Sequence, residues 1–473
     1  MSRKENPLPQ KKKTLFVSIG AAALALLLAA GALLFLFLPP GTAKEIREIP
    51  LPAQGEDALK IAVLSDSLLN RAESAEGLLY LNHTRAALAL LKQQQVSLIL
   101  FAGNLTASAD AKEYALFNDQ LAEVYDGEES VPPVVAAMGA GELAGAATVA
   151  VAQRTFAKAM GQPPRTRATA GGVQVIALGA DQTKAEDPYS AKALRWLEAE
   201  LAAAADTANG KPIFVLTPCP PDGTVDGSGV AGKKLVALLQ KYPNVISVSG
   251  GTHRPQLSEN MITQGAYTAV GSQGLSFVEL APGYYDPQQG EAGLEDAIRP
   301  QQADERPFAL IFAFARNKIT VQRWNVLDQT QEREAAAWSL YLPLATETFH
   351  YDPERRAAVN EAPHFPVQDV FAVSTIPGAG GKELDGVAFT PAADDARVAA
   401  YDLEATNRLN VTLVKRYAAD TFLGAGAAAK TALALDPTLP SGEYSIRVYA
   451  VDDFGRRSTG FLECTLTHTK TAA

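Results

Sequence analysis

Short apolar runs alternate with amphipathic segments over residues 58 to 250. Apolar runs of four to six residues predict strands at 59–64, 96–101, 131–136, 173–178, 213–216 and 245–249. Apolar positions recurring every three or four residues predict helices at 77–94, 111–125, 149–160, 190–205 and 230–241. Strand runs without strict alternation, separated by helices, indicate a sheet covered on both faces.

The pattern changes beyond residue 270. Residues 275–280, 308–314 and 319–326 predict strands with no helix between them, and 316–318 predicts the hairpin turn that joins the last two. We therefore expect an α/β fold over residues 58–350, with a two-layer β-sandwich core flanked by helices.

The C-terminal part, residues 363–470, has the pattern of an all-β sandwich. Strands are predicted at 386–389, 398–403 and 410–414, and the alternating run SIRVYAV follows Tyr444. The segment around Tyr444 resembles the late strands of a fibronectin type III domain, with the tyrosine placed as in a tyrosine corner. This resemblance implies a spacer, or a surface that binds a protein or glycan partner, without chemistry of its own.

The N-terminal residues predict a membrane anchor. Residues 14–38 carry no charge, and at about 1.5 Å per residue they reach ~38 Å, more than a ~30 Å hydrocarbon core. The basic tail, residues 1–13, places the N-terminus in the cytoplasm by the positive-inside rule. We expect a single-pass plasma-membrane protein with a transmembrane helix at 14–38, a linker at 39–57 and an extracytoplasmic bulk. The alternative is a cleaved signal peptide, but the apolar run is longer than such peptides carry.

Composition excludes several classes of function. The net charge is −10, and the absence of a basic stripe after residue 13 argues against binding to nucleic acid. Two cysteines and five histidines are too few for a disulfide framework, a structural zinc site or a multi-histidine centre.

The loops that follow five of the predicted strands share a pattern. They read LSDSLL (64–69), FAGNLT (101–106), AAMGAGE (136–142), LTPCPP (216–221) and VSGGTH (248–253). In this order they resemble the loops of calcineurin-like metallophosphoesterases, which read D-x-H, G-D, G-N-H-E/D, H-x-P and G-H-x-H. Gly103, Gly139 and Gly250 match the glycines of those loops. The resemblance covers about residues 58–345 and implies a site where two metal ions hydrolyse phosphate esters.

Most of the ligands that the resemblance implies are missing. Asp66 and His253 match the family, whereas Asn104 stands where the bridging aspartate belongs. The positions whose donor atom is lost are Leu68, Ala140, Gly141, Pro218 and Gly251. Gly141 replaces the histidine that would protonate the leaving group, so no catalytic residue is assigned.

One weak metal site could remain. Asp66, Asn104 and His253 could together hold one divalent ion (Mn, Zn or Fe) completed by water, although no cofactor is expected. Alternatively, Asp66 caps the following turn and His253 lies at a pocket rim without a ligand. Cys219 could bind a metal or act as a nucleophile, but an inert thiol is the simpler interpretation. Glu142 is interpreted as a solvated surface residue rather than a base.

Three functions follow. The first is a pseudoenzyme that binds a ligand or partner at the cell surface without turnover. The second is a residual single-metal phosphoesterase, a hydrolase acting on extracytoplasmic phosphate esters. The third is a purely structural surface protein. An open pocket without metal would favour the first, strong metal binding the second, and a filled pocket the third.

Overall fold

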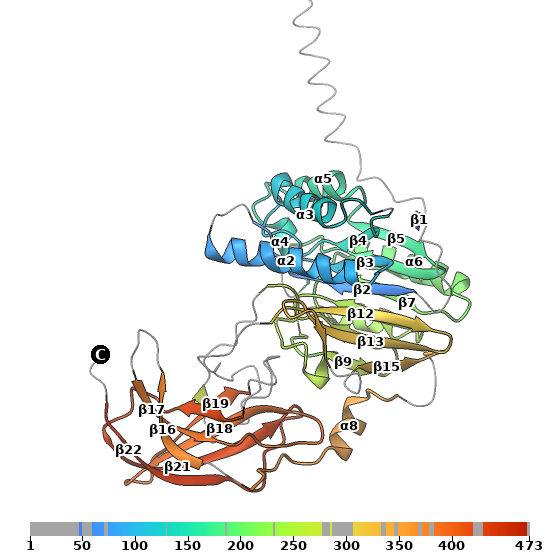
Figure 1. Cartoon of the computed structure of the whole chain (residues 1–473). Coiled ribbons are helices and arrows are strands. Elements are labelled where there is room, and N and C mark those ends of the chain that lie inside the picture. The colour runs from blue at the N-terminus through green and yellow to red at the C-terminus, as the bar shows by residue number, and fades with distance from the viewer. Residues whose placement is uncertain are drawn as a thin grey trace, which may run out of the picture. The chain divides into compact units, whose positions relative to one another are not determined.

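The structure is a computed structural model of the chain (Figure 1). It describes residues 47–49, 59–70, 74–128, 130–184, 187–229, 232–276, 284–285, 306–332, 337–344, 349–367, 371–377, 383–419 and 429–470. The expected transmembrane segment, residues 14–38, lies outside these ranges. Within them, no helix has the length and apolar character needed to cross a membrane.

Two mixed sheets form the body. The first has the strand order β1 (Arg47–Ile49), β5 (Arg165–Ala170), β6 (Val173–Leu178), β7 (Ile213–Thr217), β8 (Val245–Ser249), β10 (Thr268–Gly271) and β9 (Ile262–Gln264). The second has the order β14 (Thr330–Gln331), β13 (Lys318–Asn325), β12 (Phe308–Ala315), β2 (Lys60–Leu64), β3 (Leu98–Ala102) and β4 (Val134–Ala137), with β15 (Trp338–Tyr341) also paired to β13. The strands β2–β4 are parallel to one another, as are β6–β8.

The two sheets face each other across one apolar core. Val63 and Leu100 of one sheet and Val248 of the other are fully buried in the same cluster. Phe214 and Phe312, from opposite sheets, meet edge to face with ring centroids 5.2 Å apart. Side chains on both inner faces are therefore removed from water, which drives the sheets together. This confirms the predicted two-layer core.

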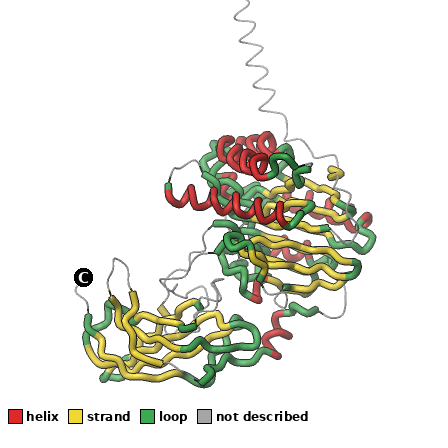
Figure 2. The backbone as a smooth tube through the Cα atoms, in the orientation of Figure 1, coloured by secondary structure: helices red, strands yellow, loops and turns green. Residues whose placement is uncertain are grey.

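Helices cover the outer faces of both sheets (Figure 2). The helices α2 (Ala75–Gln93), α3 (Ala111–Val124) and α5 (Val149–Met160) pack on the sheet that contains β2, while α6 (Ala191–Thr207) and α7 (Lys233–Leu239) pack on the other. Serine, threonine or aspartate caps most of their N-termini, because such side chains accept from otherwise unpaired N–H groups. A single turn, α4 (Ala140–Leu143), follows β4.

Several segments differ from the predicted pattern, among them β5, β9 and β10, for which no strand was predicted. Residues 47–49, expected within the linker, form β1 and pair with β5 in parallel. Leu275 and Ser276, expected to begin a strand, lie in a loop, where their N–H groups donate to the carbonyls of Ser65 and Asp66. The rest of that expected strand, residues 277–280, lies outside the described residues.

The C-terminal part consists of two antiparallel sheets. One has the order β11 (Tyr284–Tyr285), β19 (Thr412–Ala418), β18 (Val398–Asn407), β21 (Gly442–Asp452) and β22 (Leu462–His468), and the other β16 (Phe371–Pro377), β17 (Glu383–Phe389) and β20 (Thr431–Ala434). Phe389 and Val448 are fully buried in the core that the sheets share. The Tyr444 hydroxyl donates to the Pro440 carbonyl at 2.9 Å, as in a tyrosine corner.

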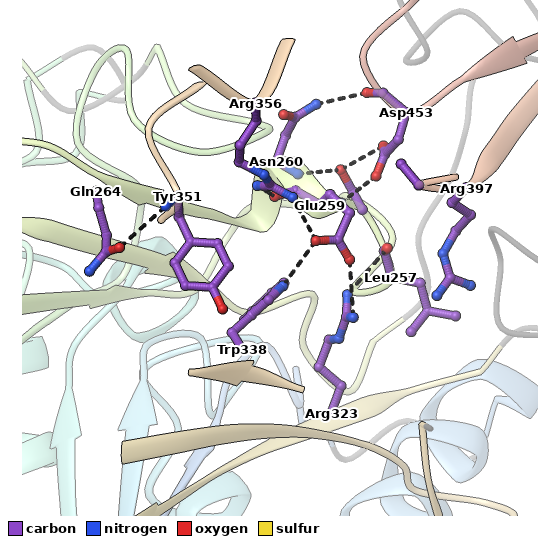
Figure 3. Close-up of polar contacts among 12 residues, drawn as sticks. Leu257, Glu259, Asn260, Gln264, Arg323, Trp338, Tyr351, Arg356, Arg397 and Asp453 are labelled. Carbon is purple, nitrogen blue, oxygen red and sulfur yellow. Dashed lines mark hydrogen bonds and ion pairs between the residues drawn. The ribbon is translucent and has the colours of Figure 1, made fainter. Parts of the chain in front are cut away.

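A buried ionic network surrounds Glu259 in the 3-10 turn η2 (Glu259–Met261) (Figure 3). Its carboxylate accepts from Arg323 at 3.1 Å, from the Trp338 indole at 3.3 Å, and from Arg356 of α8 (Pro353–Val359) at 2.6 Å. The Arg323 guanidinium also lies over the Trp338 ring, 4.5 Å from its centroid. One carboxylate thus neutralises two cations that join η2, β13 and α8.

Asp453, which follows β21, contacts the same turn. Its carboxylate accepts from the Glu259 backbone N–H and from the Ser258 hydroxyl, and its carbonyl accepts from the Asn260 amide (Figure 3). The Ser258 hydroxyl also lies 2.6 Å from the Asp226 carboxylate. A serine hydroxyl carries a single hydrogen, so one of the two carboxyl groups must supply the hydrogen for its own contact.

This contact predicts a pH dependence. Burial, assisted by the negative charges of Asp226 and Glu259, raises the pKa of Asp453 from 3.8 to about 7. The folded state therefore binds a proton that the unfolded state has lost between these values, so stability decreases as pH rises from about 4 to 7. The variant Asp453→Asn, which mimics the protonated carboxyl, is expected to be more stable than the wild type at pH 8 and equally stable at pH 4.

Urea unfolding at pH 4, 6 and 8 tests this expectation. The matched control is Asp119→Asn, because Asp119 is exposed on α3 and we expect its replacement to leave the pH profile unchanged. If the free energy of unfolding of Asp453→Asn changed with pH in the same way as that of the wild type, the raised pKa of Asp453 would be contradicted.

Candidate functional site

The loops singled out in the sequence meet at one end of the body. Because β2, β3 and β4 are parallel, as are β7 and β8, their carboxyl ends lie at the same edges of the two facing sheets. Asp66, Leu68, Asn104 and His253 have positive φ angles of 51°, 45°, 55° and 49°. Such left-handed conformations are unfavourable for residues other than glycine and cluster at functional sites. At these four positions the loops thus have the strained backbone conformation that is typical of functional sites.

Asp66 lies at the centre of these loops. Its side chain is fully buried, with Oδ1 accepting from the Asn104 amide at 2.7 Å and Oδ2 from the Gly251 N–H at 2.8 Å. Burial raises the pKa of this carboxyl, while nearby His253 and the bonds from Asn104 and Gly251 oppose the rise. Asp66 therefore ties β2 to the loops after β3 and β8 rather than capping its own turn.

The orientation of Asn104 determines what this group can bind. Its Oδ1 accepts from the Gly141 N–H at 2.9 Å, and because a backbone N–H can only donate, the amide nitrogen must face Asp66. That nitrogen has no lone pair to offer a cation, and Asp66 is fully buried beneath the cavity lining, with one hydrogen bond accepted by each oxygen. His253, the third expected ligand, is exposed. As these side chains stand, the donor set does not fit a divalent ion.

Within the described ranges, no cluster of three or more histidine, cysteine, aspartate or glutamate side chains that could hold a metal ion occurs. The amide of Asn104 instead joins Asp66 to the loop after β4 by two hydrogen bonds.

Glu142 joins the loops that follow β3 and β4. It is fully buried, so its interpretation as a solvated surface residue is wrong. Its carboxylate accepts from the backbone N–H groups of Gly139 at 2.6 Å, Asn104 at 3.1 Å and Thr106 at 3.2 Å, and also from that of Leu105. Burial raises its pKa to about 6 despite these bonds. Every lone pair is directed at the backbone, which makes Glu142 a structural residue.

The loops leave no room for the lost ligands at two positions. A Cβ at Gly141 would lie 2.2 Å from the carbonyl oxygen of Thr106, and one at Gly251 would lie 2.6 Å from that of Pro218. Gly251 also has a φ of 62°. Side chains here would collide with backbone, which cannot move aside as a flexible side chain can. The surrounding backbone therefore leaves space only for glycine at these two positions.

The variant Gly141→Ala tests this closure. Alanine gains up to about 1 kcal/mol over glycine in a helix, but overpacking against backbone costs about 1–3 kcal/mol, so we expect a net loss of stability. Gly265→Ala is the control, because a Cβ at that position would meet nothing within 4 Å and no positive φ is required there. Thermal unfolding of both variants gives the comparison, and equal midpoints would contradict the closure.

A cavity of about 490 Å³ opens over these loops. Four of the altered positions line it: Asn104, Ala140, Pro218 and Gly251. His253 also lines it, whereas Asp66 does not. The volume lies within the range of about 300–1,000 Å³ typical of pockets for small molecules.

Part of the lining comes from residues that the sequence did not predict. Ala180, Gln182, Lys184 and Pro188, after β6, line the cavity. No motif marks this segment, and its role depends on where β6 lies in the sheet.

Cys219 contributes a neutral thiol to the cavity wall. Its Sγ lies 3.7 Å from the Tyr189 hydroxyl, and burial raises its pKa to about 11. A thiol with such a pKa remains protonated at neutral pH and is a poor nucleophile. Cys219 and Cys464 are both free, so no disulfide joins them.

Comparisons with known proteins give structural matches only. No family model and no curated protein matches the chain. A dimetal phosphatase from Danio rerio is similar over 60% of this chain and 99% of its own, with 10% identity and a TM-score of 0.42. A predicted phosphoesterase from Streptococcus pneumoniae covers 61% and 99%, with 10% identity and a TM-score of 0.26. A single mutant of Vps29 from Entamoeba histolytica covers 60% and 99%, with 11% identity and a TM-score of 0.26.

Proposed function

We propose that this chain is a membrane-anchored extracytoplasmic protein whose body has a degenerate calcineurin-like phosphoesterase fold and binds a ligand without turnover. The observation that carries the proposal is the cavity, because three of the five positions that lost their donor atoms line it. Ala140, Pro218 and Gly251 now present apolar or backbone surface to a space of about 490 Å³. An open cavity favours binding over a purely structural role.

The interior of the site supports the absence of turnover. Two-metal hydrolysis needs carboxylate and imidazole ligands that bridge and flank the ions. Here the bridging position holds Asn104, whose amide donates to Asp66. The position of the leaving-group acid is Gly141, whose N–H donates to Asn104.

The other parts of the proposal rest on the sequence and the C-terminal sheets. The uncharged run at 14–38 after a basic tail supports a single membrane span with the bulk of the chain outside the cytoplasm. The antiparallel sheets and the Tyr444–Pro440 hydrogen bond support a fibronectin type III-like module, which could present a surface to a protein or glycan.

The test uses the full chain in mild detergent. The protein is equilibrated with Mn²⁺ or Zn²⁺, freed of unbound ion and assayed for bound metal and for phosphodiester hydrolysis. We expect no stoichiometric metal and no turnover above that of buffer. Bound metal with turnover that is lost in Asp66→Ala and in His253→Ala would establish the residual single-metal hydrolase instead. His253 is exposed, so its replacement spares the fold.

A further inference from the structure

The wall of the cavity is largely apolar. Ala140, Leu143, Ala180, Pro188 and Pro218 contribute hydrocarbon surface from both sides. The thiol of Cys219 is neutral and adds to this surface. Water against such a wall finds few hydrogen-bond partners, so an apolar group gains free energy by displacing it.

Lys184 is the one charged side chain in the described lining of the cavity, and it is exposed. The exposed imidazole of His253 adds a polar group. Within the described part of the wall there is no carboxylate, because Asp66 lies beneath the surface and accepts hydrogen bonds from Asn104 and Gly251. Lys184 forms no ion pair with any described residue. Since the whole chain carries a charge of −10, attraction for an anion at this cavity must come from Lys184.

We propose that the cavity binds amphipathic monoanions, with an apolar body against the wall and a single anionic group at the rim beside Lys184. The inference rests on the proposed function, since it assigns a ligand class to the same cavity. A compact, multiply charged phosphate fits less well, because the apolar wall cannot replace its hydration. At the rim, the anionic group of an amphipathic ligand stays in contact with water.

The experiment compares two ligands that share one body. Binding of 4-phenylbutyrate and of 4-phenylbutan-1-ol to the full chain in detergent is titrated by saturation-transfer NMR. Because the ion pair at Lys184 is exposed, we expect the acid to bind about threefold to fivefold more tightly than the alcohol. Lys184→Gln removes this difference and leaves the affinity for the alcohol unchanged. Lys112→Gln, an exposed lysine of α3 outside the cavity, is the matched control and changes neither affinity.

A second variant separates the proposal that the cavity binds a ligand from the proposal that it prefers an amphipathic monoanion. Ala140→Phe projects a ring into the cavity from an exposed position, and we expect it to abolish binding of both ligands. The exposed lining residue Ala144 offers Ala144→Phe as a replacement if the first variant fails to fold.

The outcomes are distinct. Binding of both ligands that persists in these phenylalanine variants, or binding of neither to the wild type, overturns the pocket and hence the proposed function. Equal affinity of the wild type for acid and alcohol overturns only the anion preference. Displacement of 4-phenylbutyrate by inorganic phosphate at similar concentration assigns the rim to phosphate and overturns the ligand class.

Discussion

Replacement of Glu259 by glutamine is expected to lower the free energy of unfolding by about 3–5 kcal/mol, because it removes the carboxylate that pairs with the buried Arg323 and the partly buried Arg356. The Arg323 side chain is 0% exposed and that of Arg356 is 16% exposed. Glutamine keeps the size of the side chain, so the loss reports charge rather than packing. Urea unfolding at neutral pH measures the change.

Two further variants make this result specific. The triple variant Glu259→Leu, Arg323→Met and Arg356→Met removes the carboxylate together with both cations, and we expect a smaller loss than in Glu259→Gln. Glu198→Gln removes the exposed ion pair with Lys241 and is expected to leave the unfolding midpoint unchanged. A loss in Glu259→Gln no larger than in Glu198→Gln would mean that the network contributes nothing to stability.

The second large effect is expected for Asn104→Asp, which restores the carboxylate of the resembled family. The new carboxylate would face that of Asp66 across a contact that is now 2.7 Å long. Two like charges at this distance cannot both ionise without a cation. With metal removed by a chelator, we expect a loss of about 3 kcal/mol at neutral pH, in the range for a buried unpaired charge.

The response to Mn²⁺ distinguishes the variant from the wild type. A carboxylate at this position would give the ion two acidic ligands and His253, so Mn²⁺ is expected to recover part of the stability of Asn104→Asp and none in the wild type. Asn82→Asp, at an exposed position of α2, controls for the added charge. Equal stabilisation of the wild type by Mn²⁺ would show that the present donor set binds the ion.

Much of the body could be predicted from the hydrophobic pattern. The strands β2, β3, β7 and β8 are short runs buried on both faces, which a sequence reveals directly. The strand β5, with the sequence RTRATA, was not predicted because four of its six residues are polar. It exists because its backbone pairs antiparallel to β6 across a two-residue turn at Gly171 and Gly172, and parallel to β1, which lies more than 100 residues earlier in the chain. The two glycines are a hairpin signal that the hydrophobic pattern does not contain.

The candidate site was predicted in part for a similar reason. The loop pattern correctly brought Asp66, Asn104 and Gly251 together, because strand ends fix where loops meet. It could not show which groups bond to one another. Glu142 can be buried because backbone N–H groups of the loop after β3 donate to its carboxylate. Lys184 lines the cavity because it lies in the segment that follows β6.

The four backbone N–H groups that donate to Glu142 also affect how much conformational entropy is lost when a ligand binds. Asn104, Leu105 and Thr106 donate in succession to one buried carboxylate, so this part of the cavity floor is fixed before any ligand arrives. Binding then requires little further ordering of the chain on this side, and more of the contact energy is retained as affinity. A floor that does not adapt also discriminates by shape. We expect ligands with broader apolar bodies to be rejected rather than accommodated.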